Sequence, residues 1–315
     1  MKPLLKPRAL RRGDLIGLVA PAGAIWDLER TNRAVRYLEG LGYRVEVGAH
    51  AGGQHGAFAG TDDERVGDLN QFLRDPRIRG VFALRGGYGT MRLLEAVDYR
   101  AARRDPKVVV GYSDITALQL ALYRRIGLVS FSGPLSAVEF ATGPDPYTEE
   151  HFWRLVTSCR KPGRLTLPPG GVVVSSFGGK AKGPLLGGCL SLVVALLGTR
   201  YSPSYRGSIL FLEDVHEQLH RLDRMLIQLR LAGILGAASG ILLGQFTDLV
   251  AADPVRPHAS LASIFESVFA GSTIPRVSEF PYGHLPCKAT LPIGLPAFMD
   301  ADRGLLRFEE AAVLA

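Results

Sequence analysis

Cysteine is scarce in this sequence and is never paired at a short spacing. The three cysteines, Cys159, Cys189 and Cys287, are odd in number and far apart, and no C-x-x-C pair occurs. This pattern argues against a disulfide framework and against a thiolate zinc site. We therefore expect the protein to work in a reducing compartment, the cytoplasm.

Long apolar segments are also missing. The longest uncharged run, residues 231–247, falls short of a membrane span and is interrupted by glycines. Near the N-terminus, the apolar stretch from Leu15 to Ala20 is too short for the hydrophobic region of a signal peptide. We expect neither a membrane partner nor secretion.

Basic residues exceed acidic ones but are not concentrated in one region. The formal net charge is +7, and apart from one short cluster between Lys6 and Arg12 the lysines and arginines are scattered. A basic stripe with interleaved aromatic residues, which nucleic-acid binding favours, does not occur. We expect no nucleic-acid partner, and a small acidic substrate fits the charge equally well.

The 315 residues allow one large or two medium domains. In the first half, short apolar runs such as GVFALRGG alternate with amphipathic stretches, including expected helices at 28–41, 62–74, from Thr90, and ending near Ala121. This alternation predicts an α/β fold with a parallel sheet flanked by helices. We predict this domain over 1–140, a Pro- and Gly-rich linker over 141–180, and a second, mixed α/β domain over 181–315.

The pattern His-Glu-x-x-His occurs at His216, Glu217 and His220, in a helix expected from about Val215 to Leu231. On a helix this is the ligand pattern of a zinc peptidase. A third ligand is needed, but the extended motif has Leu226 in place of the final histidine. A metal site of His216, His220 and Asp223 stays an alternative, while a solvated helix with leucines on its apolar face is the preferred interpretation.

The segment KVVVGYSDITALQLAL predicts a buried strand, a tight turn at residues 111–114 and a helix. A serine at such a turn, Ser113, projects its hydroxyl, and the backbone N–H groups that follow can stabilise an oxyanion. The second glycine of G-x-S-x-G is missing, and a serine here is also an ordinary helix cap. Both interpretations, nucleophile and cap, stay open on the pattern alone.

A second strand, glycine turn and helix occur in VFALRGGYGTMRLL. The amides of Gly86 and Gly87 could approach a ligand closely, or the turn could be structural. The segment is neither a P-loop nor a full dinucleotide motif. A non-catalytic nucleotide-binding module remains a further alternative.

A catalytic serine requires a base and a carboxylate that orients it. Glu213 and Asp214 follow the apolar segment SILFL and are candidates for the carboxylate, although acidic residues after a strand are often turn formers. Among seven histidines, His284 lies in a Gly- and Pro-bounded loop that could direct its ring into a cleft. From the residues alone each of these assignments stays open.

Several motifs together resemble one known family. VAPAG, RGGYG, GYSD, FSGP, GGCLSLVVALLGT, FLEDVHE, RLDRMLIQL and YGH with TLPIG occur in the order and at about the spacing of the LD-carboxypeptidase family. That family includes muramoyltetrapeptide carboxypeptidases and microcin C resistance hydrolases. The resemblance spans nearly the whole chain.

The resemblance implies a Rossmann-like N-terminal domain, a smaller β-rich C-terminal domain and a Ser-His-Glu triad. The implied nucleophile is Ser113, the base His284 and the carboxylate Glu213, with oxyanion donors at the amides of Gly87 and Asp114. The resemblance implies a homodimer. It implies no cofactor and no metal. One departure is Cys189, where the family often has asparagine.

The expected function is a serine LD-carboxypeptidase that releases the terminal D-alanine from cytoplasmic murein tetrapeptides in cell-wall recycling. The short middle segment favours this branch over the microcin C-type acyl-sulfamoyl adenylate hydrolases. A carboxypeptidase should recognise a terminal carboxylate, and Arg85 beside Gly86 is the candidate, although an arginine near a turn is more often in a surface ion pair.

Overall fold

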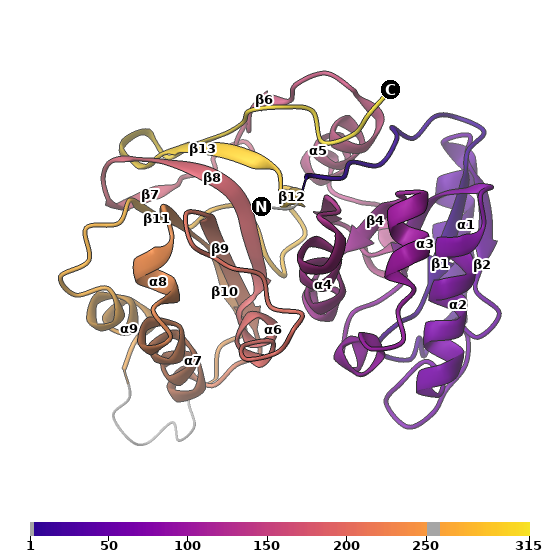
Figure 1. Ribbon diagram of the computed structural model, residues 1–315, viewed down its shortest axis with the longest axis horizontal. Coiled ribbons are helices and arrows are strands. Elements are labelled where there is room, and N and C mark those ends of the chain that lie inside the picture. Colours follow the sequence, from indigo (N-terminus) through magenta and orange to yellow (C-terminus); the bar gives the residue numbers. More distant parts are fainter. Residues whose placement is uncertain (1–2, 251–258) are drawn as a thin grey trace.

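The computed structural model describes residues 3–250 and 259–315 of the chain. Figure 1 shows two lobes, each built on its own sheet, with the N-terminal lobe in indigo to magenta and the other in pink to yellow. A connected set of buried apolar residues runs through both lobes. The sequence-based prediction of an α/β fold with a parallel first sheet is confirmed.

The first sheet has six strands in the order β12-β5-β4-β3-β1-β2. Its strands are β1 (Leu15–Val19), β2 (Arg44–Val47), β3 (Ile78–Ala83), β4 (Val108–Gly111), β5 (Ser130–Ser132) and β12 (Leu291–Ile293). All neighbours are parallel except β12, which is antiparallel to β5. β1 and β4 are buried along their whole length, because helices cover both faces of a parallel sheet.

Helices and short helical turns connect these strands or follow β5. They are α1 (Leu28–Gly40), α2 (Asp62–Arg74), η1 (Thr90–Leu93), α3 (Tyr99–Arg104), η2 (Ser113–Ile115), α4 (Thr116–Ile126), η3 (Ser136–Phe140) and α5 (Pro146–Thr157). The helix expected from Thr90 is only one turn long, and α3 starts separately. In the order β2-β1-β3-β4-β5 the chain proceeds toward one edge of the sheet from β1 to β2 and toward the other edge from β3 to β5, so the direction changes between β1 and β3. In such sheets, ligands bind at this point, outside the carboxyl ends of the strands.

The second sheet has eight strands in the order β6-β14-β13-β8-β9-β10-β11-β7. They are β6 (Gly163–Arg164), β7 (Val174–Phe177), β8 (Lys180–Cys189), β9 (Ile209–Val215), β10 (Gly240–Thr247), β11 (Arg276–Ser278), β13 (Pro296–Asp300) and β14 (Leu305–Phe308). The central strands β8 to β11 are parallel and the outer ones antiparallel. This is the mixed, β-rich sheet that was expected.

The lobe of the second sheet carries α6 (Leu190–Ala195), α7 (Leu219–Leu231), α8 (Ile234–Ala237), α9 (Leu261–Val268) and η4 (Ala301–Arg303). α7 starts four residues later than predicted, because β9 continues to Val215 and His216 has a φ of 58°. A positive φ cannot continue into a right-handed helix. The prediction of a helix from Val215 is therefore wrong at its start.

The segment 141–180, predicted as a linker, contains α5 and two short strands that belong to the second sheet. Strand β12, from the C-terminal part of the chain, pairs with β5 of the first sheet. The chain thus returns to the N-terminal lobe after building most of the second sheet. The domain limits themselves stay a prediction. Within residues 3–250 and 259–315, each helix is too short or too polar to cross a membrane.

Candidate active site

Ser113 lies at the carboxyl end of β4, where the chain turns into η2 and α4. Its φ of 63° is unusual for a residue with a side chain and costs about 1–3 kcal/mol. Such strain is a feature of serine nucleophiles on a strand-to-helix turn, where it exposes the hydroxyl. In contrast to the cap interpretation, no side-chain hydrogen bond of Ser113 caps η2 or α4.

Glu213 and His284 are brought together from different elements of the second lobe. Glu213 is on β9 and is fully buried, and its Oε2 lies 2.7 Å from Nδ1 of His284. The His284 side chain is 18% exposed. Gly283, with a φ of 135°, lets the loop approach, since a Cβ there would be 3.2 Å from Glu213 Oε2. A buried carboxylate at this distance fixes the tautomer of an imidazole and stabilises its protonated form.

Tyr112 connects the histidine with the serine turn. Its ring lies edge-on to the His284 imidazole with the ring centroids 4.9 Å apart, and it directly precedes Ser113. The structure therefore places the three residues predicted as a triad in one region, at the boundary between the two lobes. Their roles in catalysis stay predictions.

Asp214, the other carboxylate that the sequence left open, faces a different way. It accepts hydrogen bonds from the backbone N–H groups of Ser191 (2.8 Å) and Val215 (2.9 Å), and from the thiol of Cys189 (3.4 Å). Burial raises its pKa. Asp214 thus caps the start of α6, while its neighbour Glu213 contacts the histidine.

The glycine turn after β3 lies directly against Ser113. A Cβ at Gly86 would be 2.8 Å from the Cβ and 3.0 Å from the Oγ of Ser113, and only 3.5 Å from the amide nitrogen of Asp114. Gly87 has a φ of 107° and packs against Gly23 of the loop after β1. The predicted oxyanion donors, the amides of Gly87 and Asp114, therefore belong to two turns that touch.

The side chain of Asp114 holds the glycine turn in place. It is buried and its Oδ2 accepts a hydrogen bond from the backbone N–H of Thr90 at 2.7 Å. Burial raises the pKa of this carboxyl group, although the hydrogen bond to Thr90 opposes that change. The two turns are thus tied by a side-chain bond as well as by packing.

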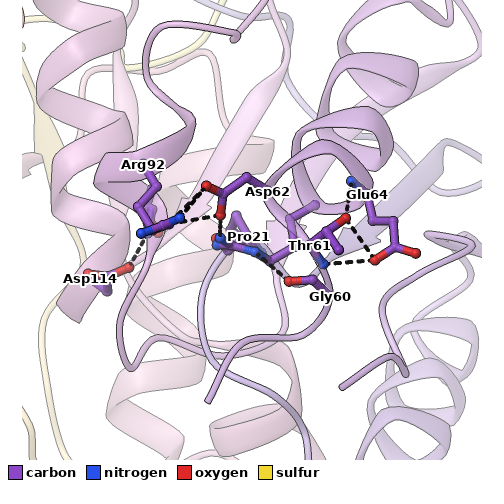
Figure 2. Close-up of polar contacts among 9 residues, drawn as sticks. Pro21, Gly60, Thr61, Asp62, Glu64, Arg92 and Asp114 are labelled. Carbon is purple, nitrogen blue, oxygen red and sulfur yellow. Dashed lines mark hydrogen bonds and ion pairs between the residues drawn. The ribbon is translucent and has the colours of Figure 1, made fainter. Parts of the chain in front are cut away.

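A buried arginine, Arg65, links the loop after β1 to the start of α2. Arg65 donates to the carbonyls of Pro21 and Gly60 and pairs with Asp62. Asp62 in turn pairs with Arg92 at 2.8 Å (Figure 2). This network fixes the loop after β1 and the start of α2 beside the glycine turn.

Arg85, the predicted partner of a substrate carboxylate, is partly buried and donates from Nη1 to the carbonyl of Ala24 at 2.5 Å. It is not in a surface ion pair in the described part of the chain. A guanidinium has five N–H donors, so this bond leaves others for a ligand. Substrate binding by Arg85 and Gly86 stays a prediction.

A cavity of about 270 Å³ opens beside His284. Its lining includes Tyr112, Glu139 and Asp145, together with residues of the His284 loop. Glu139, one of these lining residues, pairs with Lys288 at 2.5 Å. Sequence reasoning missed Tyr112, Glu139 and Lys288, although the positions of Tyr112 within GYSD and of Lys288 four residues after His284 were available signals.

His216 and His220 do not form the zinc-peptidase arrangement. His216 and Glu217 precede α7, whereas His220 is in its first turn, so the helical ligand geometry is missing. Glu217 pairs with Arg221 at 3.4 Å. In residues 3–250 and 259–315, no three His, Cys, Asp or Glu side chains gather so that they could hold a metal ion. The zinc alternative is not supported.

Comparison with known proteins gives matches over both lobes. The sequence model of the LD-carboxypeptidase N-terminal domain matches residues 16–133, and that of the LD-carboxypeptidase C-terminal domain matches residues 182–299. A probable murein peptide carboxypeptidase from Bacillus subtilis is 37% identical over 298 residues, which cover 94% of this chain and 91% of that protein.

Two solved structures are similar along nearly the whole chain. The muramoyltetrapeptide carboxypeptidase from Oxalobacter formigenes has a TM-score of 0.81 and 32% identity, covering 93% of this chain and 97% of its own. The microcin C7 self-immunity protein MccF in complex with glutamyl sulfamoyl guanosine has a TM-score of 0.91 and 26% identity. The match covers 98% of this chain and 100% of the MccF chain.

Proposed function

The chain belongs to the LD-carboxypeptidase family and is a serine-type peptidase, and from this premise we propose that it releases the terminal D-alanine of murein tetrapeptides. The observation that carries the proposal is the buried Glu213 carboxylate 2.7 Å from His284 Nδ1, beside the strained turn of Ser113. The bond cleaved is the amide that joins the L-configured end of the diamino acid to the terminal D-alanine.

In the proposed mechanism His284 acts as general base and then as general acid. Its Nε2 takes the proton of the Ser113 hydroxyl as Oγ attacks the carbonyl carbon. The tetrahedral intermediate collapses, its C–N bond breaks, and His284 passes the proton to the departing amine of D-alanine. Water, deprotonated by His284, then hydrolyses the acyl-enzyme. Glu213 stabilises the imidazolium formed in each half of the reaction.

The amides of Gly87 and Asp114 serve as the oxyanion donors. Gly86 supports this role, since a Cβ there would be 3.5 Å from the Asp114 nitrogen, so the two turns converge on one small space. One such donor is worth about 3 kcal/mol in the transition state. The hydrogen bond between Thr90 and the Asp114 carboxylate keeps the donors from relaxing apart.

For substrate binding, the D-alanine carboxylate pairs with free N–H groups of Arg85 beside Gly86. The bond from Arg85 to the Ala24 carbonyl fixes the direction of the guanidinium. A guanidinium held in this way loses less entropy on pairing with a carboxylate than an exposed lysine would.

The proposed location is the cytoplasm, where thiols stay reduced; Cys159, Cys189 and Cys287 are all unpaired. A homodimer, implied by the family resemblance, is proposed as the assembly. Light scattering on the purified protein measures its mass against the 34.0 kDa of one chain.

A second candidate is hydrolysis of an acyl-sulfamoyl nucleoside. It is favoured by the similarity to MccF, whose solved structures include a complex with aspartyl sulfamoyl adenosine. The chain has Cys189 where the family often has asparagine, and this buried thiol forms hydrogen bonds with Ser191 and Asp214.

A panel of substrates distinguishes the two candidates. Murein tetra- and pentapeptides with lysine or diaminopimelate, with and without the sugar, are incubated beside an aminoacyl sulfamoyl adenosine, and products are identified by mass spectrometry. Release of D-alanine from tetrapeptides alone supports the proposal. Cleavage of only the sulfamoyl nucleoside contradicts it.

A further inference from the structure

Lys288 is a buried lysine close to the candidate site. Its side chain is 2% exposed, and its Nζ lies 2.5 Å from Oε1 of Glu139. The same ammonium lies 3.7 Å from the centroid of the Tyr112 ring, over its face. A cation at this distance from a desolvated ring is attracted by the π-electrons.

Glu139 is the centre of the cluster. Its Oε1 accepts a hydrogen bond from the Tyr112 hydroxyl at 2.9 Å as well as from Lys288, and its Oε2 accepts one from the backbone N–H of Leu135 at 2.8 Å. Both carboxylate oxygens therefore have partners. The ring of Tyr112 is held at its hydroxyl end by Glu139 and on its face by Lys288.

Tyr112 transmits this restraint to two residues of the proposed mechanism. It directly precedes Ser113 in the chain, and its ring packs against the imidazole of His284 in a T-shaped contact with a centroid distance of 4.9 Å. A rotation of the Tyr112 ring would move the surface against which His284 packs. The orientation of the base and the backbone of the nucleophile thus share one neighbour.

The loop that carries His284 is fixed at its other end by the backbone of Lys288. The Lys288 N–H donates to the Thr148 hydroxyl at 2.8 Å, and that hydroxyl donates to the carbonyl of Pro286 at 2.9 Å. Thr148 is on α5, so the loop is tied to a helix of the first lobe. Lys288 therefore connects the His284 loop to both η3 and α5.

We propose that Lys288 and Glu139 are positioning residues that, through Tyr112, keep His284 and Ser113 in the alignment that the reaction needs. This inference rests on the proposed function of Ser113 and His284. Neither residue is assigned contact with the substrate's reacting atoms.

The energetics favour a role in orientation over one in stability. A buried ion pair is often no more stabilising than apolar residues of similar volume, because both charges lose their hydration. The pair carries no net charge, so its electrostatic effect on His284 is weaker than that of a single charge. The titratable groups around the Lys288 ammonium are Glu139, Tyr112 and Glu213. What the pair supplies is directional contact with one aromatic ring.

The test compares Lys288→Met, Glu139→Gln and the double variant in kcat, KM and melting temperature. Each single variant leaves one buried group without its partner and should lower stability. The double variant removes both charges, and its melting temperature should return close to the wild-type value. Its kcat should nevertheless stay about 100-fold below wild type with KM little changed, as expected for a misaligned catalytic group.

A merely structural pair would give another result. If kcat of the double variant recovers together with its melting temperature, the inference is overturned. The matched control is Lys107→Met, which removes a fully buried lysine paired with Asp105 at the start of β4, away from Ser113. This variant should lose stability but keep the wild-type kcat.

A substrate-independent readout separates this inference from the proposed function. An alkyl fluorophosphonate forms an Oγ–P bond with an activated serine as the P–F bond breaks and fluoride leaves, with the serine proton taken by the base. Labelling of Ser113 in the double variant should be about 100-fold slower than in wild type. If no peptide releases D-alanine, the proposed function fails. If labelling rates are equal, the inference fails.

Discussion

Nδ1 of His284 and Oε2 of Glu213 lie 2.7 Å apart, although 71 residues separate them in the sequence. Glu213 is anchored on the central strand β9 and is completely buried, while His284 is on a loop. The loop histidine is thus oriented by a rigid element of the sheet. The activity of the protein should therefore depend on whether the Glu213 carboxylate can accept a hydrogen bond from His284.

Glu213→Gln keeps the shape of the side chain but replaces the carboxylate with a neutral amide. The amide can no longer stabilise the imidazolium, and it can present its NH₂ group to the ring. We expect kcat for D-alanine release to fall by about 10³–10⁴-fold with the melting temperature little changed. Steady-state kinetics on a tetrapeptide measures this, and a loss of less than about tenfold would contradict the role given to Glu213.

Gly86→Ala should disable the site without a change in any polar group. Its Cβ would lie 2.8 Å from the Cβ of Ser113, so one of the two turns must move. A displacement of about 1 Å at the nucleophile costs about 10²-fold in rate. The matched control is Gly40→Ala at the end of α1, where a Cβ meets no atom within 4 Å. Equal activity of both variants would rule out the close contact.

Because His151 on α5 is buried, we predict that the protein loses stability as the pH falls. Burial lowers its pKa from 6.5 to about 4. Between these values the unfolded chain binds a proton that the folded chain does not, so the free energy of unfolding falls as pH decreases from 6.5 to 4. The full contribution is about 3 kcal/mol.

Urea unfolding of wild type and His151→Gln at pH 7 and pH 4 measures this contribution. The stability of wild type relative to the variant should fall by about 3 kcal/mol between the two pH values. Other acid-titrating groups are common to both chains and cancel in the comparison. Parallel pH dependences would show that His151 is not desolvated as described.

Local patterns in the sequence were sufficient for most of the parallel strands of the first sheet, because buried strands such as β4 are continuous apolar runs. The serine turn and the glycine turn were recognisable for the same reason, since each follows such a strand. The choice between Glu213 and Asp214 was not recognisable from pattern alone. It depends on which of two adjacent side chains faces the His284 loop and which faces α6.

Long-range contacts account for what the sequence did not predict. Strand β12 is only three residues long and pairs with β5 across the chain, so no periodicity marks it. Lys288 and Glu139 are 149 residues apart and join only because β12 returns the chain to the first lobe. The start of α7 was misplaced because nothing in the hydrophobic pattern marks the positive φ of His216.

The most direct measurement of the central claim compares D-alanine release from a murein tetrapeptide by the wild-type protein and by Ser113→Ala, with product quantified by mass spectrometry. Removal of the proposed nucleophile should lower the rate at least about 10⁴-fold, to the limit of detection, while the folded state is retained. Release of D-alanine by Ser113→Ala at the wild-type rate would contradict the account.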